Sequence, residues 1–301
     1  MNTKFINWLI FVSLALTWGS SFILMKRGLE VFSSEQVAAM RIFIAFLFLS
    51  PLIYKYVKKE LLKHWKGFIG MGVLGNLIPA FLFTKAETGL SSSMTGALNS
   101  LTPSFTLLIG VLLFNVKTRW INALGITIGF IGAIGLLMVG KKDTMDNNLW
   151  FVFYVILATI CYALSVNIIK KHLDEVNPIA CTVWAMLFIG PIAGIYLFTT
   201  DFTYRLTTNP MAMQSLGFVS LLAIFGTAIS VIVFNVLIRN TNAVFASAVT
   251  YLIPIVAMGW GIFDNEVVLP LHFAWIGLIL LGVYLVNKNF PVNDELSPKD
   301  N

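Results

Sequence analysis

The sequence predicts an all-α polytopic membrane protein, with ten transmembrane helices arranged as two inverted five-helix repeats. Three observations lead to this fold class: the apolar composition, a series of ten apolar runs, and a proline that recurs at the same place in both halves. Of 301 residues, 58% are hydrophobic and only 11% are charged, whereas a soluble domain carries roughly 25% charged residues. A chain so poor in charge cannot cover its own surface in water, so lipid must surround most of it.

Each apolar run is long enough to cross a bilayer, whose hydrocarbon core needs about 20 helical residues. The first run could be read as a signal peptide, but its 21 residues exceed the usual apolar region and nine similar runs follow. Ten spans fit the charge pattern better than nine or eleven. We expect them at 5–25, 36–54, 67–84, 94–114, 120–140, 149–169, 178–200, 215–238, 243–263 and 267–287.

The distribution of lysine and arginine predicts the orientation of the spans, because cytoplasmic loops carry the excess of these residues. With both termini in the cytoplasm, the inner segments hold 13 basic residues and the outer loops hold six. The cluster from Lys55 to Lys66 contributes much of this difference. Lys26 and Arg27 fall at an outer end, against the trend.

The two halves of the chain show a weak internal repeat. A shift of 151 residues places Gly75 on Gly226 and Pro103 on Pro254, among seven matches in 36 positions. Seven identities are weak evidence for a repeat, because mostly apolar sequences often match by chance. A proline at the same place inside corresponding spans is more informative. A shift of 144 places Lys26 and Arg27 on Lys170 and Lys171. We expect a first five-helix repeat at 1–145, a second at 146–289, and a disordered cytoplasmic tail at 290–301.

Five spans per repeat is an odd number, so the second copy enters the membrane upside down. Inverted repeats of this kind are a transporter architecture, with the binding site near the midplane at the repeat interface. Pro103 and Pro254 each free the carbonyl four residues earlier, at Asn99 and Thr250. These breaks are either tolerated kinks that pack helices or kinks beside a substrate cavity, and both readings stay open.

Arg41 is the single charge well inside a predicted span. An arginine at the centre of a helix costs roughly 2.5–3.5 kcal/mol on insertion scales. Its side chain either reaches the headgroups or faces the cavity, where it would pair with a substrate carboxylate, Glu87 or Glu30. The matching place in the second repeat, near Trp184, is uncharged, which favours a functional role.

Several other polar and aromatic residues interrupt the apolar pattern. Four asparagines lie in separate spans, and each is suited either to hold helices together or to contact a ligand: Asn76, Asn99, Asn167 and Asn235. Interhelical hydrogen bonds of this type are worth only about 0.6 kcal/mol on average. Among the aromatic residues, Trp18 and Tyr251 are the cavity candidates, because each neighbours another break in the pattern.

The sequence offers no catalytic, cofactor or metal motif. No Walker loop, GxSxG, HExxH or acidic metal cluster is visible, and the scattered basic residues form no nucleic-acid patch. We therefore expect no enzyme activity, no cofactor and no nucleic acid. The expected partners are the lipid bilayer and a small-molecule substrate. Glycines at 125, 129, 132 and 135 indicate a face for helix packing or for a homodimer through the helix at 120–140.

The opening stretch TWGSSFILMKRGLE, followed by SSEQVAAMRIFIAFLFL, resembles the first helix pair of the EamA-type branch of the drug/metabolite transporter (DMT) superfamily. In that family a Trp-Gly-Ser in the first helix precedes a single arginine early in the second, and here these are Trp18, Gly19, Ser20 and Arg41. The proline-containing fourth and ninth spans and the glycine-rich fifth and tenth spans are also similar. The resemblance covers essentially residues 5 to 288.

This resemblance implies a secondary transporter of a bacterial cytoplasmic (inner) membrane, exporting small metabolites such as amino acids by alternating access. The alternative is a multidrug or organic-cation exporter, which needs a buried carboxylate that no span supplies. The family implies a central cavity from helices one to four and six to nine, to which Ser20 would offer a hydroxyl. Family members usually end the fourth and ninth helices on an acid. Glu266 fits, whereas Asn115 departs from the pattern. The site candidates are Trp18, Ser20, Arg41, Asn76, Asn99, Pro103, Asn167, Asn235, Tyr251 and Pro254.

Overall fold

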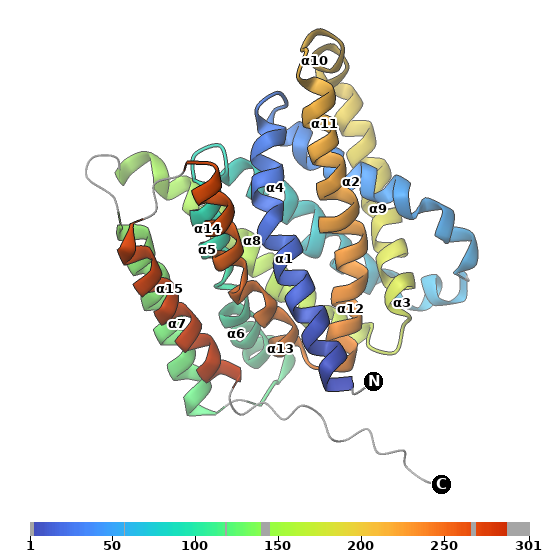
Figure 1. Cartoon of the computed structure of the whole chain (residues 1–301). Coiled ribbons are helices and arrows are strands. Elements are labelled where there is room, and N and C mark those ends of the chain that lie inside the picture. The colour runs from blue at the N-terminus through green and yellow to red at the C-terminus, as the bar shows by residue number, and fades with distance from the viewer. Residues whose placement is uncertain (1–2, 57, 118, 140–144, 266–268, 288–301) are drawn as a thin grey trace.

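A computed structural model describes residues 3–56, 58–117, 119–139, 145–265 and 269–287. Within these ranges the chain is a bundle of helices without strands (Figure 1). Eight helical segments are long and apolar enough to cross a membrane, and two further apolar helices, α7 and α15, accompany them. The described part of the chain thus has the ten-helix, all-α organisation that its composition predicts. The predicted tail 290–301 and Glu266 lie outside the described residues.

The bounds of the elements follow the predicted spans closely, but five spans are divided. Up to residue 138 the elements are α1 (Thr3–Leu29), α2 (Ser34–Leu49), η1 (Ser50–Lys55), α3 (Lys58–Gly72), η2 (Val73–Leu77), α4 (Ile78–Ala86), α5 (Ser92–Asn99), α6 (Thr102–Phe114) and α7 (Trp120–Met138). The remainder are α8 (Met145–His172), α9 (Pro178–Thr199), α10 (Phe202–Thr208), α11 (Ala212–Leu221), η3 (Leu222–Ile229), α12 (Ser230–Asn240), α13 (Ala243–Ser247), η4 (Ala248–Tyr251), α14 (Ile253–Phe263) and α15 (Pro270–Asn287). The sequence did not predict α10, which is short and polar.

The segments η2 and η3 are π-helical turns in the middle of two spans. A wider turn leaves carbonyls that need another donor inside a membrane. Side chains supply it: Asn76 Nδ2 donates to the Met71 carbonyl at 3.2 Å, and Ser230 Oγ donates to the Phe225 carbonyl at 2.6 Å. Pro79, directly after η2, removes one further backbone donor.

The two prolines predicted to break spans do so. Before Pro103, α5 ends at Asn99 and α6 begins at Thr102, whose hydroxyl donates to the freed Asn99 carbonyl at 2.7 Å. Before Pro254, the 3₁₀ turn η4 separates α13 from α14. Each break lets a new helix start with proline in its first turn, where the missing N–H costs nothing.

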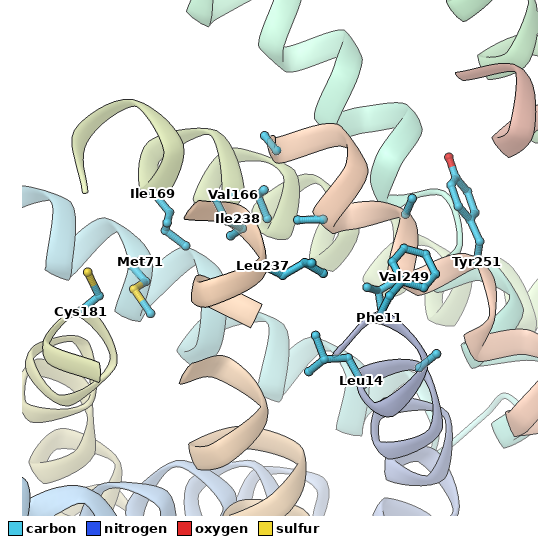
Figure 2. Close-up of a cluster of buried hydrophobic side chains, with 14 of the residues drawn as sticks. Phe11, Leu14, Met71, Val166, Ile169, Cys181, Leu237, Ile238, Val249 and Tyr251 are labelled. Atoms are coloured by element: carbon cyan, nitrogen blue, oxygen red, sulfur yellow. The ribbon is translucent and has the colours of Figure 1, made fainter. Parts of the chain in front are cut away.

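A cluster of buried apolar side chains fills the end of the bundle where α1 starts. Figure 2 shows Val166 and Ile169 of α8 close to Met71 of α3 and Ile238 of α12. Phe11 belongs to the same cluster and packs at 5.5 Å, centroid to centroid, against Phe245 of α13. Three members of the cluster, Met71, Val166 and Ile169, also line the candidate site described below. Cys181 lies at the edge of the cluster, and both cysteines of the chain are buried and form no disulfide bond.

The glycine-rich face of α7 packs against α15 of the same chain, and Figure 1 shows this pair beside the rest of the bundle. A Cβ at Gly282 would lie 2.5 Å from Gly129 N and 2.6 Å from Gly125 O. Gly135 faces the indole ring of Trp275 equally closely. The glycines therefore serve helix packing, one of the two roles expected of them. A homodimer through this helix remains a prediction and would have to use another face of it.

Lys26 and Arg27, at the end of α1 opposite to Lys4, have acidic partners. Both side chains contact the carboxylate of Asp264, which directly follows α14, and Arg27 also contacts Glu30 at 2.6 Å. The contacts with Asp264 hold this end of α1 against the end of α14. Asn115 ends α6 in a left-handed conformation (φ 57°), with Val116 N donating to Gly110 O at 3.0 Å. This left-handed helix end stands where the acid was expected.

We predict that Gly282→Ala destabilises the α7–α15 pair, because the new methyl group would collide with backbone atoms that cannot rotate away. Overpacking of this kind costs about 1–3 kcal/mol. The matched control is Gly277→Ala on the same helix, where a Cβ meets nothing within 4 Å. Thermal unfolding of the purified protein in detergent should show a lower midpoint for Gly282→Ala and an unchanged midpoint for Gly277→Ala. Equal midpoints for the two variants would contradict the close contact.

Candidate functional site

A cavity of about 90 Å³ lies among the helices that the membrane would surround. It has room for several water molecules, and hence for a small polar ligand. Its walls come from α1, α2, α3 to α4, α5, α6, α8, η3 to α12, α13 and η4, whereas none of the described residues of α7 and α15 reaches it. The polar side chains in the walls are Trp18, Ser21, Arg41, Asn76, Asn99, Thr102, Tyr162, Ser165, Asn235, Ser247 and Thr250.

Arg41 brings a buried positive charge to this cavity. Its side chain extends from α2, only 9% of the residue is exposed, and Nε donates to Thr227 Oγ1 on η3 at 2.7 Å. The Tyr162 hydroxyl and the Glu87 carboxylate are near enough to interact with the guanidinium electrostatically. Among the residues that the structure describes, no carboxylate lies within ion-pair distance of Arg41, so Glu30 and Glu87 do not form the expected pair.

Trp18 joins α1 to the π-helical turn η3. Its indole Nε1 donates to the Gly226 carbonyl at 3.0 Å, which satisfies a backbone group beside the irregular turn. The close approach needs the small residues that follow Trp18. A Cβ at Gly19 would lie 2.4 Å from Val256 Cβ on α14, so only glycine allows this packing of α1 against α14. The Trp-Gly-Ser stretch therefore positions α1 against two helices of the second half.

Aromatic rings form much of the apolar wall. Trp18 meets Phe234 edge to face with ring centroids 5.0 Å apart. Phe83 meets Phe22 at 5.9 Å and stacks on Tyr162 at 5.7 Å. These contacts are typical of aromatic pairs in protein cores. The cavity thus combines a cation with an apolar aromatic lining.

Many residues of the cavity lining form pairs, and the two members of a pair are separated by 144 or 151 residues, the two shifts of the sequence repeat. At an offset of 144, α1 contributes Trp18, Ser21, Phe22 and Met25, and α8 contributes Tyr162, Ser165, Val166 and Ile169. At an offset of 151, Gly75, Phe83 and Asn99 correspond to Gly226, Phe234 and Thr250, all in the lining. Asn76 corresponds in the same way to Thr227, the partner of Arg41. Sequence reasoning missed Tyr162, Ser165 and Thr227, although extending the two shifts to polar positions would have found them.

The site candidates predicted from the sequence divide into two groups. Trp18, Arg41, Asn76, Asn99 and Asn235 line the cavity. The others are not in its lining, and each has a different place in the structure.

Two of these residues make hydrogen bonds elsewhere. Ser20 Oγ accepts from Trp260 Nε1 at 2.8 Å in a surface groove between α1, α11 and α14. Asn167 Nδ2 donates to the carbonyls of Thr106 and Ala163 at 3.0 and 2.9 Å, which ties α8 to α6. Ser20 and Asn167 therefore connect helices.

The remaining candidates, Pro103, Pro254 and Tyr251, are buried close to the two helix breaks. The two prolines lie in the first turns of α6 and α14. The ring of Tyr251 belongs to the apolar cluster, and its hydroxyl points away from the other labelled residues in Figure 2. These three residues shape the breaks from which Asn99 and Thr250 face the cavity.

The cavity is suited to hold a small organic anion. Its described lining contains a single cation, Arg41, several hydroxyl and amide groups, and no aspartate or glutamate. None of the described residues forms a cluster of histidine, cysteine or acids that could hold a metal ion. A guanidinium binds carboxylates through paired N–H donors, which gives geometric as well as electrostatic selectivity.

The chain is similar to transporters over nearly its whole length. It is 25% identical to an uncharacterized transporter of Archaeoglobus fulgidus, with 93% of this chain and 98% of that protein covered. It is also 25% identical to the uncharacterized inner membrane transporter YedA of Escherichia coli, with 95% and 93% covered. Protein PagO of Salmonella typhimurium is 23% identical, with 94% of each chain covered.

A solved crystal structure, described only as "Crystal structure of protein", has the same fold, with a TM-score of 0.67 at 13% identity. It covers 93% of this chain and 96% of its own. The profile of the EamA-like transporter family matches residues 6–138 and again residues 149–288. Because these two matches together take in most of the sequence, the chain belongs to the EamA-like transporter family.

Proposed function

We propose that this protein is a secondary transporter that exports a small metabolite with a carboxylate group, such as an amino acid or a related compound. The observation that carries the proposal is Arg41, a buried cation in the cavity that has no ion-paired carboxylate among the described residues. Burying a charge is costly unless a partner compensates for it. A substrate carboxylate at Arg41 would supply that compensation only when the site is filled.

Two structural repeats of opposite orientation would provide alternating access. The paired positions at offsets of 144 and 151 support this division, because equivalent elements of the two proposed repeats face one cavity. The two π-helical turns and the two proline breaks also recur at corresponding places. In transporters of this architecture, one bundle rocks against the other around a fixed central site.

The ends of α1 supply contacts that such a movement would exchange. At the end where α1 starts, Asn240 Nδ2 of α12 donates to Asn7 Oδ1 at 3.2 Å. At the other end, Asp264 contacts Lys26 and Arg27. Opening the cavity to either side of the membrane along α1 requires one of these two sets of contacts to separate.

An organic-cation exporter fits the lining less well. Aromatic faces attract cations, and Trp18, Phe22 and Phe234 would offer them. Arg41 repels a cation, however, and no acid in the described lining offsets that repulsion. We therefore place the multidrug alternative second.

We predict that liposomes containing the purified protein release one class of compound selectively. They are loaded with a mixed pool of amino acids, organic acids, nucleobases, sugars and organic cations, and mass spectrometry measures what leaves. Carboxylate-bearing compounds should leave faster than from protein-free liposomes. Release of organic cations alone would support the second candidate. Release of no class from folded protein would contradict the transport proposal.

We predict that Arg41→Ala lowers the transport rate at low substrate concentration by about 10- to 100-fold, since hydrogen bonds to charged groups contribute about 1.5–3 kcal/mol. Arg41→Lys keeps the charge but loses the paired donors, so it should retain an intermediate rate. The control is Arg205→Ala, because Arg205 lies on α10 and pairs with Asp201 outside the cavity. Full transport by a folded Arg41→Ala variant would remove Arg41 from the site.

We propose that both termini face the cytoplasm, as the lysine and arginine distribution predicts. A green fluorescent protein fused after Asn301 should then fluoresce, whereas alkaline phosphatase fused there should be inactive. Alkaline phosphatase inserted after Asn209, between α10 and α11, should be active because this connection would face outward. The reverse pattern at the two positions would overturn the orientation.

A further inference from the structure

Arg41 and Asn235 each bring to the cavity a polar group that the corresponding position of the other half does not. Arg41 corresponds at the offset of 144 to Ala185. Asn235 corresponds at the offset of 151 to Thr84, which is not in the lining and whose hydroxyl donates to the Ala80 carbonyl at 2.9 Å. The cation from α2 and the amide from α12 are therefore not balanced by the paired positions. These two groups can give a bound molecule a fixed direction.

The amide of Asn235 is held in one orientation. Nδ2 donates to Thr182 Oγ1 at 3.0 Å, and Thr182 Oγ1 donates its own proton to the Pro178 carbonyl at 3.1 Å. Since a hydroxyl has a single proton, Thr182 can only accept from Asn235. The NH₂ group must therefore face Thr182, and this hydrogen-bond network assigns Oδ1 to the other position.

Asn235 Oδ1 is a buried acceptor without a donor among the described residues. The residue is 3% exposed and belongs to the cavity lining. Buried polar atoms are nearly always hydrogen-bonded, and one that is not calls for an explanation. A donor on a bound molecule would explain it, because the amide is already fixed and needs no rearrangement to accept.

We propose that Arg41 and Asn235 bind opposite ends of the substrate, which is an organic anion with an N–H or O–H donor at its far end. This inference rests on the proposed function, since it concerns the same cavity. Arg41 is held by Thr227, and Asn235 lies eight residues further along the same helical segment. At a rise of about 1.5 Å per residue or slightly less in the π-helical turn, the backbone positions of Thr227 and Asn235 are at most about 12 Å apart along the segment. We therefore expect an elongated substrate, with its charge and its donor apart.

The two anchors exclude related molecules. A simple fatty acid would satisfy Arg41 but leave the Asn235 acceptor unpaired, and rejection through an unpaired buried group is a strong form of selectivity. An alkylamine would place a cation next to Arg41. The ω-hydroxy and ω-amino acids satisfy both anchors, and the aromatic rings of Phe83 and Phe234 would cover the chain between them.

The test measures binding to the purified full chain in detergent, read from tryptophan fluorescence, since Trp18 lines the cavity. The probes are the unsubstituted, ω-hydroxy and ω-amino acids from butanoate to octanoate, together with the matching alkylamines. We expect the best ω-substituted acid to bind about 10-fold more tightly than the unsubstituted acid of equal length, as one satisfied buried acceptor implies. This comparison uses the wild-type protein and depends on no variant.

Variants then assign the preference to Asn235. Asn235→Leu should bind both acids with equal affinity, close to that of wild type for the unsubstituted acid. Asn167→Leu is the control, because Asn167 is a buried asparagine outside the cavity and should keep the 10-fold preference. Asn235→Asp should favour the ω-amino acid over the ω-hydroxy acid. Thermal unfolding of each variant reports whether it is folded.

Three results would overturn the inference: equal binding of substituted and unsubstituted acids by wild type, tighter binding of alkylamines, or no binding of any probe. Failure of the proposed function gives a different result, namely tight binding of an ω-substituted acid without its release from liposomes. If the liposomes release a compound of another kind and the probes do not bind, the protein transports but the two-anchor site is wrong.

Discussion

The absence of water in a bilayer governs how this chain can depart from regular helix. Every backbone group that leaves the helical hydrogen-bond pattern must find a partner within the protein. The departures at η2, at η3 and at the two proline breaks all lie at the cavity, and side chains serve the freed carbonyls there. Asn76 donates to Met71 and Thr102 donates to Asn99, while Trp18 donates to Gly226 from another helix. The irregular backbone segments therefore coincide with the candidate site, where polar side chains satisfy the freed carbonyls.

The helix α1 occupies a special place because it belongs to the first half of the chain but packs largely on the second. Its small residues allow this: Gly19 meets Val256 of α14, and a Cβ at Gly28 would lie 2.6 Å from Val219 of α11. At the 144-residue shift α1 corresponds to α8, and α8 packs on α4 and α6 of the first half. Each half therefore contributes one helix that packs mainly on the other half and lines the shared cavity.

Much of this fold could be predicted from the sequence, because hydropathy and proline position act locally. The ten apolar runs and the breaks before Pro103 and Pro254 are examples. The π-helical turns could not be predicted, since they depend on side chains such as Asn76 and Ser230 that serve carbonyls five residues earlier. The sequence drew attention to Arg41 as an isolated charge, but its contact with Thr227 joins residues 186 positions apart and follows only from the packing. Asn167 could not be distinguished by residue type from the asparagines that do line the cavity, nor Ser20 from the serines that do.

The distance along the chain between Arg41 and Thr227 also has a consequence for biogenesis. At a synthesis rate of about 5–20 residues per second, the 186 intervening residues take roughly 10–40 s to emerge. Throughout that interval α2 carries a guanidinium whose hydroxyl partner Thr227 has not yet been made, and Tyr162 emerges only after about two thirds of it. An isolated helix with such a charge draws water or headgroups toward it. We therefore expect α2 to reach its final depth only after η3 has entered the membrane, so that the first half of the chain matures together with the second.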